Sequence, residues 1–252
     1  MNNDLIWVES FRPHTLDECI LPERIKTRFR KMIESGTIQN YAAVGGPGSG
    51  KTSSARAMCE ELGIEYIMIN MSNESGIDTV RNKIVNFASS MSFTSSYKVI
   101  ILDEFDHANK NSAQPALRGI IEEFQQNCRF IITANFQNKI IEPLFSRCPI
   151  ISFDFTQDER TEILTQFIKR IQSILNENEI AYDLKELITF CKSYFPDLRQ
   201  ILNTLQLNSA NGELQFSSLG VTSTEKIDSL IAVLKKKESG RQGFLPAHGQ
   251  HA

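Results

Sequence analysis

The sequence lacks a long apolar run, because no stretch approaches the roughly 20 apolar residues that a membrane-spanning helix requires. Its opening segment, MNNDLIWVES, has neither the basic end nor the apolar core of a secretory signal peptide. The sequence therefore argues against a membrane span and against secretion, and we expect a cytoplasmic protein.

Paired cysteines and an excess of positive charge are also missing. The five cysteines are scattered, and none forms a C-x-x-C pair of the kind that holds zinc, so reduced thiols are expected. The formal net charge is -3, which argues against binding DNA through bulk positive charge. Any contact with nucleic acid would have to use a local group of cations or the N-termini of helices.

Short apolar runs alternate with amphipathic segments over the first 154 residues. The apolar runs predict strands at 40–44, 64–70, 97–102, 129–134 and 149–153. The segments 51–62, 77–90 and 112–124 predict helices, with Pro115 in the first turn of the last one. Strands that alternate with helices predict the α/β class, with a parallel sheet covered on both faces.

The pattern after residue 154 is helical. Thr156 and Glu159 form a T-x-x-E capping box, Asp183 is expected to cap a second helix, and Pro196 is expected to open a third. We therefore predict an α/β domain over residues 1–154 and a small all-α domain over 155–222. The remainder, 223–252, is predicted to be a truncated or disordered tail.

The segment AVGGPGSGKTSSA contains the pattern G-x-x-x-x-G-K-[ST]. Its glycines let backbone N–H groups turn toward phosphate, its lysine neutralises the β and γ oxygens, and its threonine hydroxyl binds Mg²⁺. We expect the ammonium of Lys51 to be solvated without nucleotide. The alternative, a glycine-rich turn that binds nothing, fits the strand–loop–helix context less well. The expected nucleotide-binding residues of this loop are Gly45, Gly46, Pro47, Gly48, Ser49, Gly50, Lys51, Thr52 and Ser53.

Two acids follow the predicted strand 97–102 in the segment VIILDEFD. Asp103, with Thr52, can coordinate Mg²⁺, and Glu104 is placed to polarise an attacking water, although adjacent acids also occur in solvated turns. The pair favours ATP hydrolysis over phosphate transfer by a kinase, because no second substrate site is evident. Asp106 and His107 are interpreted as loop residues without assigned chemistry.

Three further polar residues each allow two interpretations. Asn135 follows a strand that could lie beside the first one, where it could bind the γ-phosphate or the attacking water, or it could form a turn. Arg147 could be an ordinary surface residue or a charge presented to a neighbouring subunit. Arg199 lies near a predicted helix N-terminus, where cations are disfavoured, so it could be a phosphate ligand or a surface residue.

Taken in order, these motifs resemble those of the AAA+ ATPase subunits of sliding-clamp loaders, both the large subunits of T-even phages and the small subunits of replication factor C. The SRC tripeptide and the segment GIDTVRNKI are more specific for this family than the two nucleotide motifs. The matching stretches, from about residue 9 to 206, are ESFRPHTLDECILPE, GGPGSGKTS, ESGIDTVRNKI, VIILDEFD, AQPALRGIIEE, FIITAN, LFSRCPIISF and FPDLRQILNTLQ.

The resemblance implies a P-loop AAA+ domain with a five-stranded parallel sheet, followed by a small all-α lid domain, and it implies ATP and Mg²⁺ as cofactors. It assigns Glu104 and Lys51 to catalysis. It makes Asn135 sensor 1 and Arg199 sensor 2. Arg147 of the SRC tripeptide would act in trans, as an arginine finger in the ATP site of the next subunit.

Other implied roles concern the base and the DNA. Arg12 and Pro13 would approach the adenine, and Gln114 would couple DNA contact to the catalytic carboxylate. Arg81, and the helix that begins near Ile77, would contact the phosphates of primer–template DNA. A solvated surface charge is the alternative interpretation of Arg81.

The implied function is that of a clamp-loader ATPase, stimulated by clamp and DNA, which opens the sliding clamp and loads it onto primer–template DNA during replication. The implied partners are that DNA, the clamp and other loader subunits in a pentameric, hetero-oligomeric ring, without a membrane. The alternatives are another DNA-associated AAA+ ATPase, such as a helicase loader or branch-migration helicase, and a structural subunit that binds ATP without hydrolysing it. A phage origin, and hence the host cytoplasm, rests on the resemblance alone.

Two features depart from the family pattern. Gly76 stands where the phage relatives are expected to have a basic DNA contact. The chain also stops before the helical collar domain that closes the ring in such loaders. We therefore expect the isolated chain to be a monomer, and loading to need a collar from another polypeptide.

Overall fold

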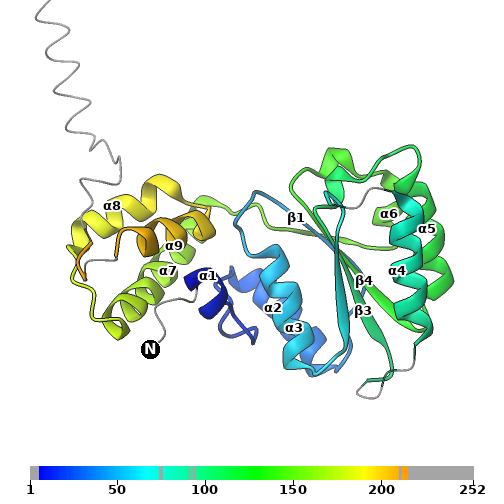
Figure 1. Cartoon of the computed structure of the whole chain (residues 1–252), viewed down its shortest axis with the longest axis horizontal. Coiled ribbons are helices and arrows are strands. Elements are labelled where there is room, and N and C mark those ends of the chain that lie inside the picture. Colours follow the sequence, from blue (N-terminus) through cyan, green and yellow to red (C-terminus); the bar gives the residue numbers. More distant parts are fainter. Residues whose placement is uncertain (1–5, 74–75, 91, 93–94, 210–211, 215–252) are drawn as a thin grey trace, which may run out of the picture.

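The computed structural model describes residues 6–73, 76–90, 92, 95–209 and 212–214. An α/β part and a helical part lie side by side and are joined by the segment that follows the last strand (Figure 1). The tail predicted over 223–252 lies outside the described residues. Within the described part, none of the helices combines the length and apolarity that a bilayer span requires.

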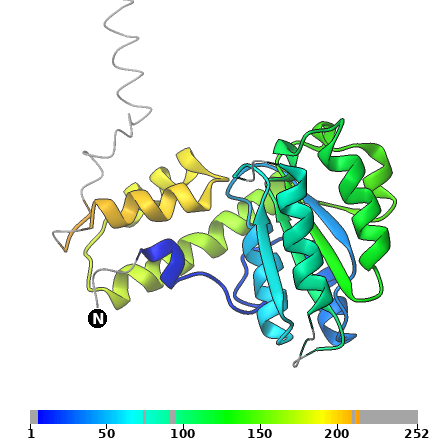
Figure 2. The same cartoon turned by 45° about the vertical axis from the view of Figure 1, so that its right-hand side comes forward.

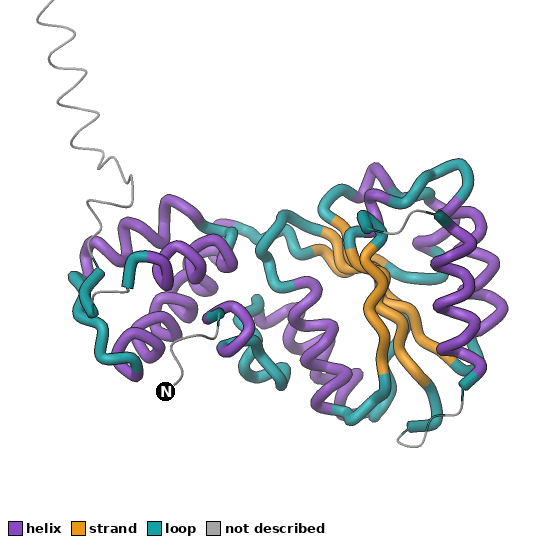
Figure 3. Tube along the Cα trace, viewed as in Figure 1, coloured by secondary structure: helices purple, strands orange, loops and turns teal. Residues whose placement is uncertain are grey.

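A five-stranded sheet with the order β2-β3-β4-β1-β5 forms the centre of the α/β part. Figure 3 shows its strands in orange between helices. All neighbouring strands are parallel, which confirms the predicted sheet. β1 pairs with β4, so the strand before Asn135 does lie beside the first strand. The strands are β1 (Tyr41–Val44), β2 (Tyr66–Asn70), β3 (Lys98–Asp103), β4 (Cys128–Ala134) and β5 (Ile150–Ser152).

Helices cover both faces of the sheet, because successive side chains of a strand point to opposite faces. On one face, Val99 and Ile101 of β3 pack in a core with α2 (Glu23–Glu34) and α3 (Lys51–Glu61). On the other face, Ile100 and Leu102 pack with α4 (Ile77–Ser89) and α5 (Ala113–Phe124). Figures 1 and 2 show these two layers, which explain why the strands read as nearly continuous apolar runs.

Short elements connect the strands beyond β3 and β4. The single-turn helix η1 (Phe105–His107) follows β3, and η2 (Gln137–Lys139) and α6 (Glu142–Phe145) lie between β4 and β5. The sequence did not predict them, because each is too short to show a helical period. They matter because they carry or flank polar residues of the site.

The helix α2 was also not predicted, although its pattern was available. Ile25, Phe29 and Met32 recur at helical spacing and are buried. Phe29 stacks at tilted angles on Tyr41 of β1 and on Phe153, so α2 is anchored directly beside the strand that leads into the glycine-rich loop.

The helical part consists of α7 (Gln157–Glu177), α8 (Leu184–Tyr194) and α9 (Leu198–Leu207), which share one apolar core. Trp7 of the short helix α1 (Trp7–Ser10) belongs to the same core, so the N-terminal segment packs on this part (Figure 1). The predicted division of the chain at residues 154 and 222 stays a prediction.

The caps of these helices agree with the sequence in two cases out of three. Thr156 and Glu159 form the predicted capping box of α7, and Asp183 caps α8. The start of α9 was predicted wrongly, because Asp197 rather than Pro196 opens this helix. The side chain of Asp197 accepts a hydrogen bond from the third residue of α9, as an N-cap does.

Candidate nucleotide-binding and hydrolysis site

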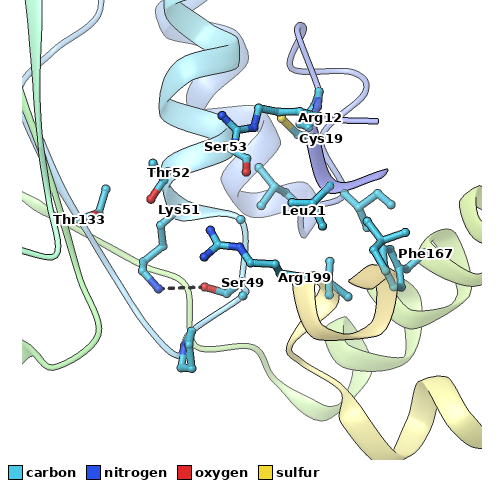
Figure 4. A pocket seen from close by; sticks show the side chains of 18 of the residues that line it. Arg12, Cys19, Leu21, Ser49, Lys51, Thr52, Ser53, Thr133, Phe167 and Arg199 are labelled. Atoms are coloured by element: carbon cyan, nitrogen blue, oxygen red, sulfur yellow. Dashed lines mark hydrogen bonds between the residues drawn. The ribbon is translucent and has the colours of Figure 1, made fainter. Parts of the chain in front are cut away.

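A pocket lies at the carboxyl edge of the sheet, between the α/β part and the helical part (Figure 4). Because β3, β4 and β1 are neighbours, the segments that follow these strands meet there. The loop after β1, the end of β3 and the residue after β4 line one side. The N-terminal segment, α7 and α9 line the other, so six separate parts of the chain form one site.

The loop between β1 and α3 depends on several of its glycines. Gly48 and Gly50 have φ angles of 69° and 88°, in the left-handed region that glycine adopts without strain. A Cβ atom on Gly48 would lie 2.4 Å from Oδ1 of Asp197, so the loop contacts the cap of α9 directly. Residues 47–53 line the pocket, and the free N–H groups at the start of α3 follow this loop.

The ammonium of Lys51 is buried against its own loop. Nζ donates hydrogen bonds to the carbonyls of Gly45 at 2.8 Å and Gly46 at 2.7 Å, and to Oδ1 of Asn135 at 3.0 Å. Burial lowers the pKa of Lys51 to about 8, although three nearby aspartates raise it again. The expectation of a solvated ammonium is therefore wrong, because the loop carbonyls and Asn135 take the place of water.

A carboxylate and two hydroxyl groups meet at the end of β3. Thr52 Oγ1 donates a 2.6 Å hydrogen bond to Asp103 Oδ1, and the hydroxyl of Thr133 on β4 donates to the same oxygen. Carboxylate and hydroxyl oxygens are the hard ligands that Mg²⁺ prefers. The donor set of Thr52 and Asp103 therefore fits the metal that the sequence predicts.

Glu104 follows directly and lines the same pocket. Its φ angle is 53°, in a region that residues other than glycine seldom occupy. Its N–H donates a 3.2 Å hydrogen bond to the Thr133 hydroxyl, which therefore contacts both acids of the motif. Such a backbone conformation persists where its surroundings hold it, and it is often found at functional sites.

Asn135 is held from two directions. Its N–H donates to Asp106 Oδ1 at 3.2 Å, and its side-chain oxygen accepts from Lys51. The interpretation of Asp106 as a loop residue is wrong, because it lies in η1 and is buried. Among the described residues, Asp106 Oδ2 is the buried side-chain oxygen that has no hydrogen-bond partner. Asp106 thus contributes a carboxylate that holds the backbone of Asn135.

The half of the pocket next to the N-terminal segment is largely apolar. Arg12 and Pro13, which the resemblance assigns to the adenine, line this half, and Arg12 is paired with Glu9 at 2.6 Å. Figure 4 labels Leu21 of the N-terminal segment and Phe167 of α7 among its lining side chains. Apolar walls of this kind suit the faces of a flat aromatic base.

Arg199 is the second residue of α9 and lines the pocket from the helical part. In Figure 4 its guanidinium lies close to Ser49 and Lys51 of the loop. Its positive charge is one of the causes that lower the pKa of Lys51, after burial. Two cations from different parts of the chain therefore converge on the loop, as expected for a site that binds a polyanion.

Arg147 does not line this pocket. Its Nε donates to Glu122 Oε1 of α5 at 2.6 Å, and Nη2 donates to the same oxygen. Nη1 donates to the Pro143 carbonyl at 2.7 Å and to Ser146 Oγ at 2.9 Å. The hydrogen bonds that Arg147 donates to Glu122 lower the pKa of this carboxyl group below its ordinary value. Arg147 is therefore kept away from its own nucleotide pocket.

The residues predicted to meet DNA lie on α4 and α5. Ile77 is the first residue of α4, and Arg81 is exposed one turn later. Gln114 is fully buried, and its amide donates to the Ala108 and Lys139 carbonyls at 3.0 and 2.9 Å. Its side-chain oxygen accepts the N–H of residue 141 at 2.8 Å. Gln114 thus ties the segment after η1 to the segment between η2 and α6.

The sequence analysis missed several residues of the site, polar ones among them. Thr133 lies inside a continuous apolar run, and its hydroxyl was the one polar group there that could have indicated a site residue. Asp106 lies three residues after Asp103, and only its burial distinguishes it from a loop acid. Arg170 of α7 also lines the pocket, and as one cation on an amphipathic helix it gives no signal of its own.

Comparisons with known proteins identify the family of this chain. The family model described as "ATPase family associated with various cellular activities (AAA)" matches residues 41–154. The chain is 37% identical over 235 residues to the sliding-clamp-loader large subunit of Enterobacteria phage T4, covering 91% of this chain and 73% of that protein. It is 32% identical over 238 residues to the replication factor C small subunit of Saccharolobus solfataricus, covering 90% and 70%.

A solved structure shows the same fold at lower identity. The RuvB Holliday junction branch migration motor of Thermotoga maritima aligns with a TM-score of 0.59 and 22% identity, covering 79% of this chain and 64% of that one. That likeness concerns the fold alone. On sequence identity and coverage, the chain belongs to the sliding-clamp-loader family of AAA ATPases, and it is an ATPase subunit that acts in DNA replication.

Proposed function

We propose that this ATPase subunit opens a sliding clamp and loads it onto primer–template DNA as one member of a pentameric, hetero-oligomeric ring. The observation that carries the proposal is an asymmetry of the site. The pocket collects the phosphate loop, both acids after β3, Asn135 and Arg199, whereas Arg147 is held outside it. A subunit that holds Arg147 outside its own pocket can present this cation to the site of a neighbouring subunit.

Binding of ATP would use both halves of the pocket. The adenine would lie against the apolar half beside Arg12 and Pro13, and the triphosphate would lie along the loop. Lys51 would leave the Gly45 and Gly46 carbonyls to bind the β and γ oxygens. Thr52 and Asp103 would hold Mg²⁺, which would supply positive charge to the phosphate oxygens.

Hydrolysis would depend on residues at the ends of β3 and β4. Glu104 would orient and polarise the attacking water, and Asn135 would hydrogen-bond that water or the γ-phosphate. Arg199 would bind the γ-phosphate from α9 and so link the helical part to the nucleotide. Arg147 would enter the site of the next subunit and stabilise the charge that develops on the transferred phosphoryl group.

DNA would act on this site through α4 and α5. Arg81 and the N-terminus of α4 at Ile77 would contact phosphates of primer–template DNA. Gln114 would transmit that contact, since its buried hydrogen bonds link the segment after η1 to the end of η2 and the residues that follow it. DNA bound inside the ring of subunits would release Glu104 for hydrolysis, and hydrolysis would then free the clamp.

The ATPase rate of the subunit, assembled with its partner subunits, tests the proposal. Clamp and primed DNA are added separately and together, and Lys51→Ala serves as the inactive control. We expect the highest rate with both present. Stimulation by DNA that does not depend on clamp would favour another DNA-associated AAA+ ATPase. Nucleotide binding without turnover under every condition would favour a structural subunit.

A further inference from the structure

Arg24, on the exposed side of α2, holds the segment that joins the sheet to the helical part. Its Nε donates to Glu159 Oε1 at 2.7 Å. Its Nη1 and Nη2 donate to the carbonyls of Ser152 and Asp154, both at 2.8 Å. One planar guanidinium therefore contacts the end of β5, the middle of the connecting segment and the first turn of α7.

The first end of this connecting segment is fixed to the phosphate loop. Ser152 pairs with Val44, the last residue of β1. The N–H of Phe153 donates to the Val44 carbonyl at 2.6 Å. A Cβ atom on Gly45 would lie 2.7 Å from the backbone of Phe153, so the segment packs directly on the first glycine of the loop.

The second end is fixed to the helical part. Oε2 of Glu159 accepts the N–H of Thr156, and the Thr156 hydroxyl accepts the N–H of Glu159, which completes the capping box. Glu159 therefore shares its two oxygens between the helix cap and Arg24. The helix that starts there, α7, packs in one core with α9, the helix of Arg199.

The backbone of Arg24 is held in place by its neighbours on α2, which are in the core. Ile25 and Phe29 are buried between α2 and the sheet, at 1% and 0% exposure. The Arg24 guanidinium extends from a fixed helix and donates to three acceptors along the connecting segment. It therefore restricts rotation of this segment more than a single ion pair would. By contrast, Arg30 of the same helix pairs with Glu23 and Asp17 on the surface of the α/β part.

We propose that Arg24 is a positioning residue, which clamps the β5–α7 connection and thereby holds α9, with Arg199, against the phosphate loop. This inference rests on the proposed role of Arg199. Without the clamp, the helical part adopts a wider range of orientations, and fewer molecules present Arg199 to the γ-phosphate. The apparent affinity for ATP then falls in proportion to the fraction of molecules that still present Arg199 to the γ-phosphate.

The experiment measures ATP affinity and turnover of the full chain in Arg24→Ala and Arg24→Lys. Arg30→Ala is the matched control, because the two arginines are 42% and 43% exposed on the same helix. We expect Arg24→Ala to weaken ATP binding and slow turnover by about tenfold each, and Arg24→Lys to restore part of both. Combined with Arg199→Ala, the same change should have an effect of less than about twofold, because the residue that Arg24 positions is gone.

A distance measurement separates the proposed role of Arg24 from the proposed role of Arg199. All five native cysteines are buried, so spin labels can be placed at Lys31→Cys on α2 and Asn203→Cys on α9. Arg24→Ala should broaden the distribution of distances between these labels, and Arg30→Ala should leave it unchanged. An unchanged width, or full additivity with Arg199→Ala, overturns the role of Arg24. A broadened distribution together with normal ATP binding by Arg199→Ala shows instead that Arg24 positions the helical part and that the proposed role of Arg199 is wrong.

Discussion

The ammonium of Lys51 donates a 3.0 Å hydrogen bond to the side-chain oxygen of Asn135. A residue that follows β1 and a residue that follows β4 are therefore joined across the edge of the sheet. Both side chains are proposed to bind the terminal phosphates, so without nucleotide they satisfy one another. Binding of ATP would replace these contacts with contacts to phosphate oxygens.

Nucleotide affinity should depend on pH through Lys51. Burial lowers its pKa to about 8, and phosphate binds the charged form, so affinity is full below that pH and falls as pH rises through it. The expected loss is about tenfold between about pH 7 and about pH 9. Titration of a fluorescent ATP analogue across this range measures it. In Lys51→Arg the guanidinium stays charged, so a curve as steep as that of the native protein would contradict the assignment.

Glu104→Gln should separate binding from chemistry. The substitution keeps the shape of the side chain but removes the charge that polarises water, so ATP should still bind while turnover falls about 10²- to 10⁴-fold. Steady-state release of phosphate and a binding titration measure the two effects. Glu123→Gln, at an exposed position of α5, is the control and should turn over normally. Normal turnover by Glu104→Gln would place the base elsewhere.

Thr133→Val should slow hydrolysis, although the sequence analysis did not identify this residue. The valine fills the same buried space but removes the donor to Asp103 and the acceptor for the Glu104 N–H. Because the variant loses a hydrogen bond to a charged group, we expect turnover to fall by about tenfold or more. Thr133→Ser retains the hydroxyl and should recover most of the rate. Equal turnover in the valine and serine variants would show that the hydroxyl has no part in the reaction.

Arg147→Ala should act on a neighbouring subunit. The isolated chain should bind ATP normally, because Arg147 does not line its own pocket. Assembly-dependent hydrolysis should fall by the roughly 10³- to 10⁵-fold that such a finger provides. Mixing this variant with Lys51→Ala should restore some activity, since a mixed interface can pair an intact loop with an intact finger. Mixtures that assemble but never hydrolyse ATP would show that Arg147 acts within its own subunit.

Local features of the sequence were sufficient to predict most of the fold and half of the site. The glycine-rich loop, the paired acids and the capping box at Thr156 are set by backbone conformation and spacing within a few residues. The five strands followed from apolar runs, because a strand buried on both faces has no polar side to interrupt it. The helix α2 has an equally local pattern, and it could have been predicted from its spacing alone.

The tertiary structure alone decided how these pieces meet. The burial of Lys51, the hydroxyl of Thr133 between two acids, the contact of Gly48 with Asp197 and the clamp made by Arg24 join residues that are far apart in sequence. A long-range contact leaves no periodic pattern along the chain, because it depends on strand order and on how helices pack on the sheet. The amino-acid sequence therefore determined which chemical groups are present, and the packing of the sheet against the helical part determined which of them act together.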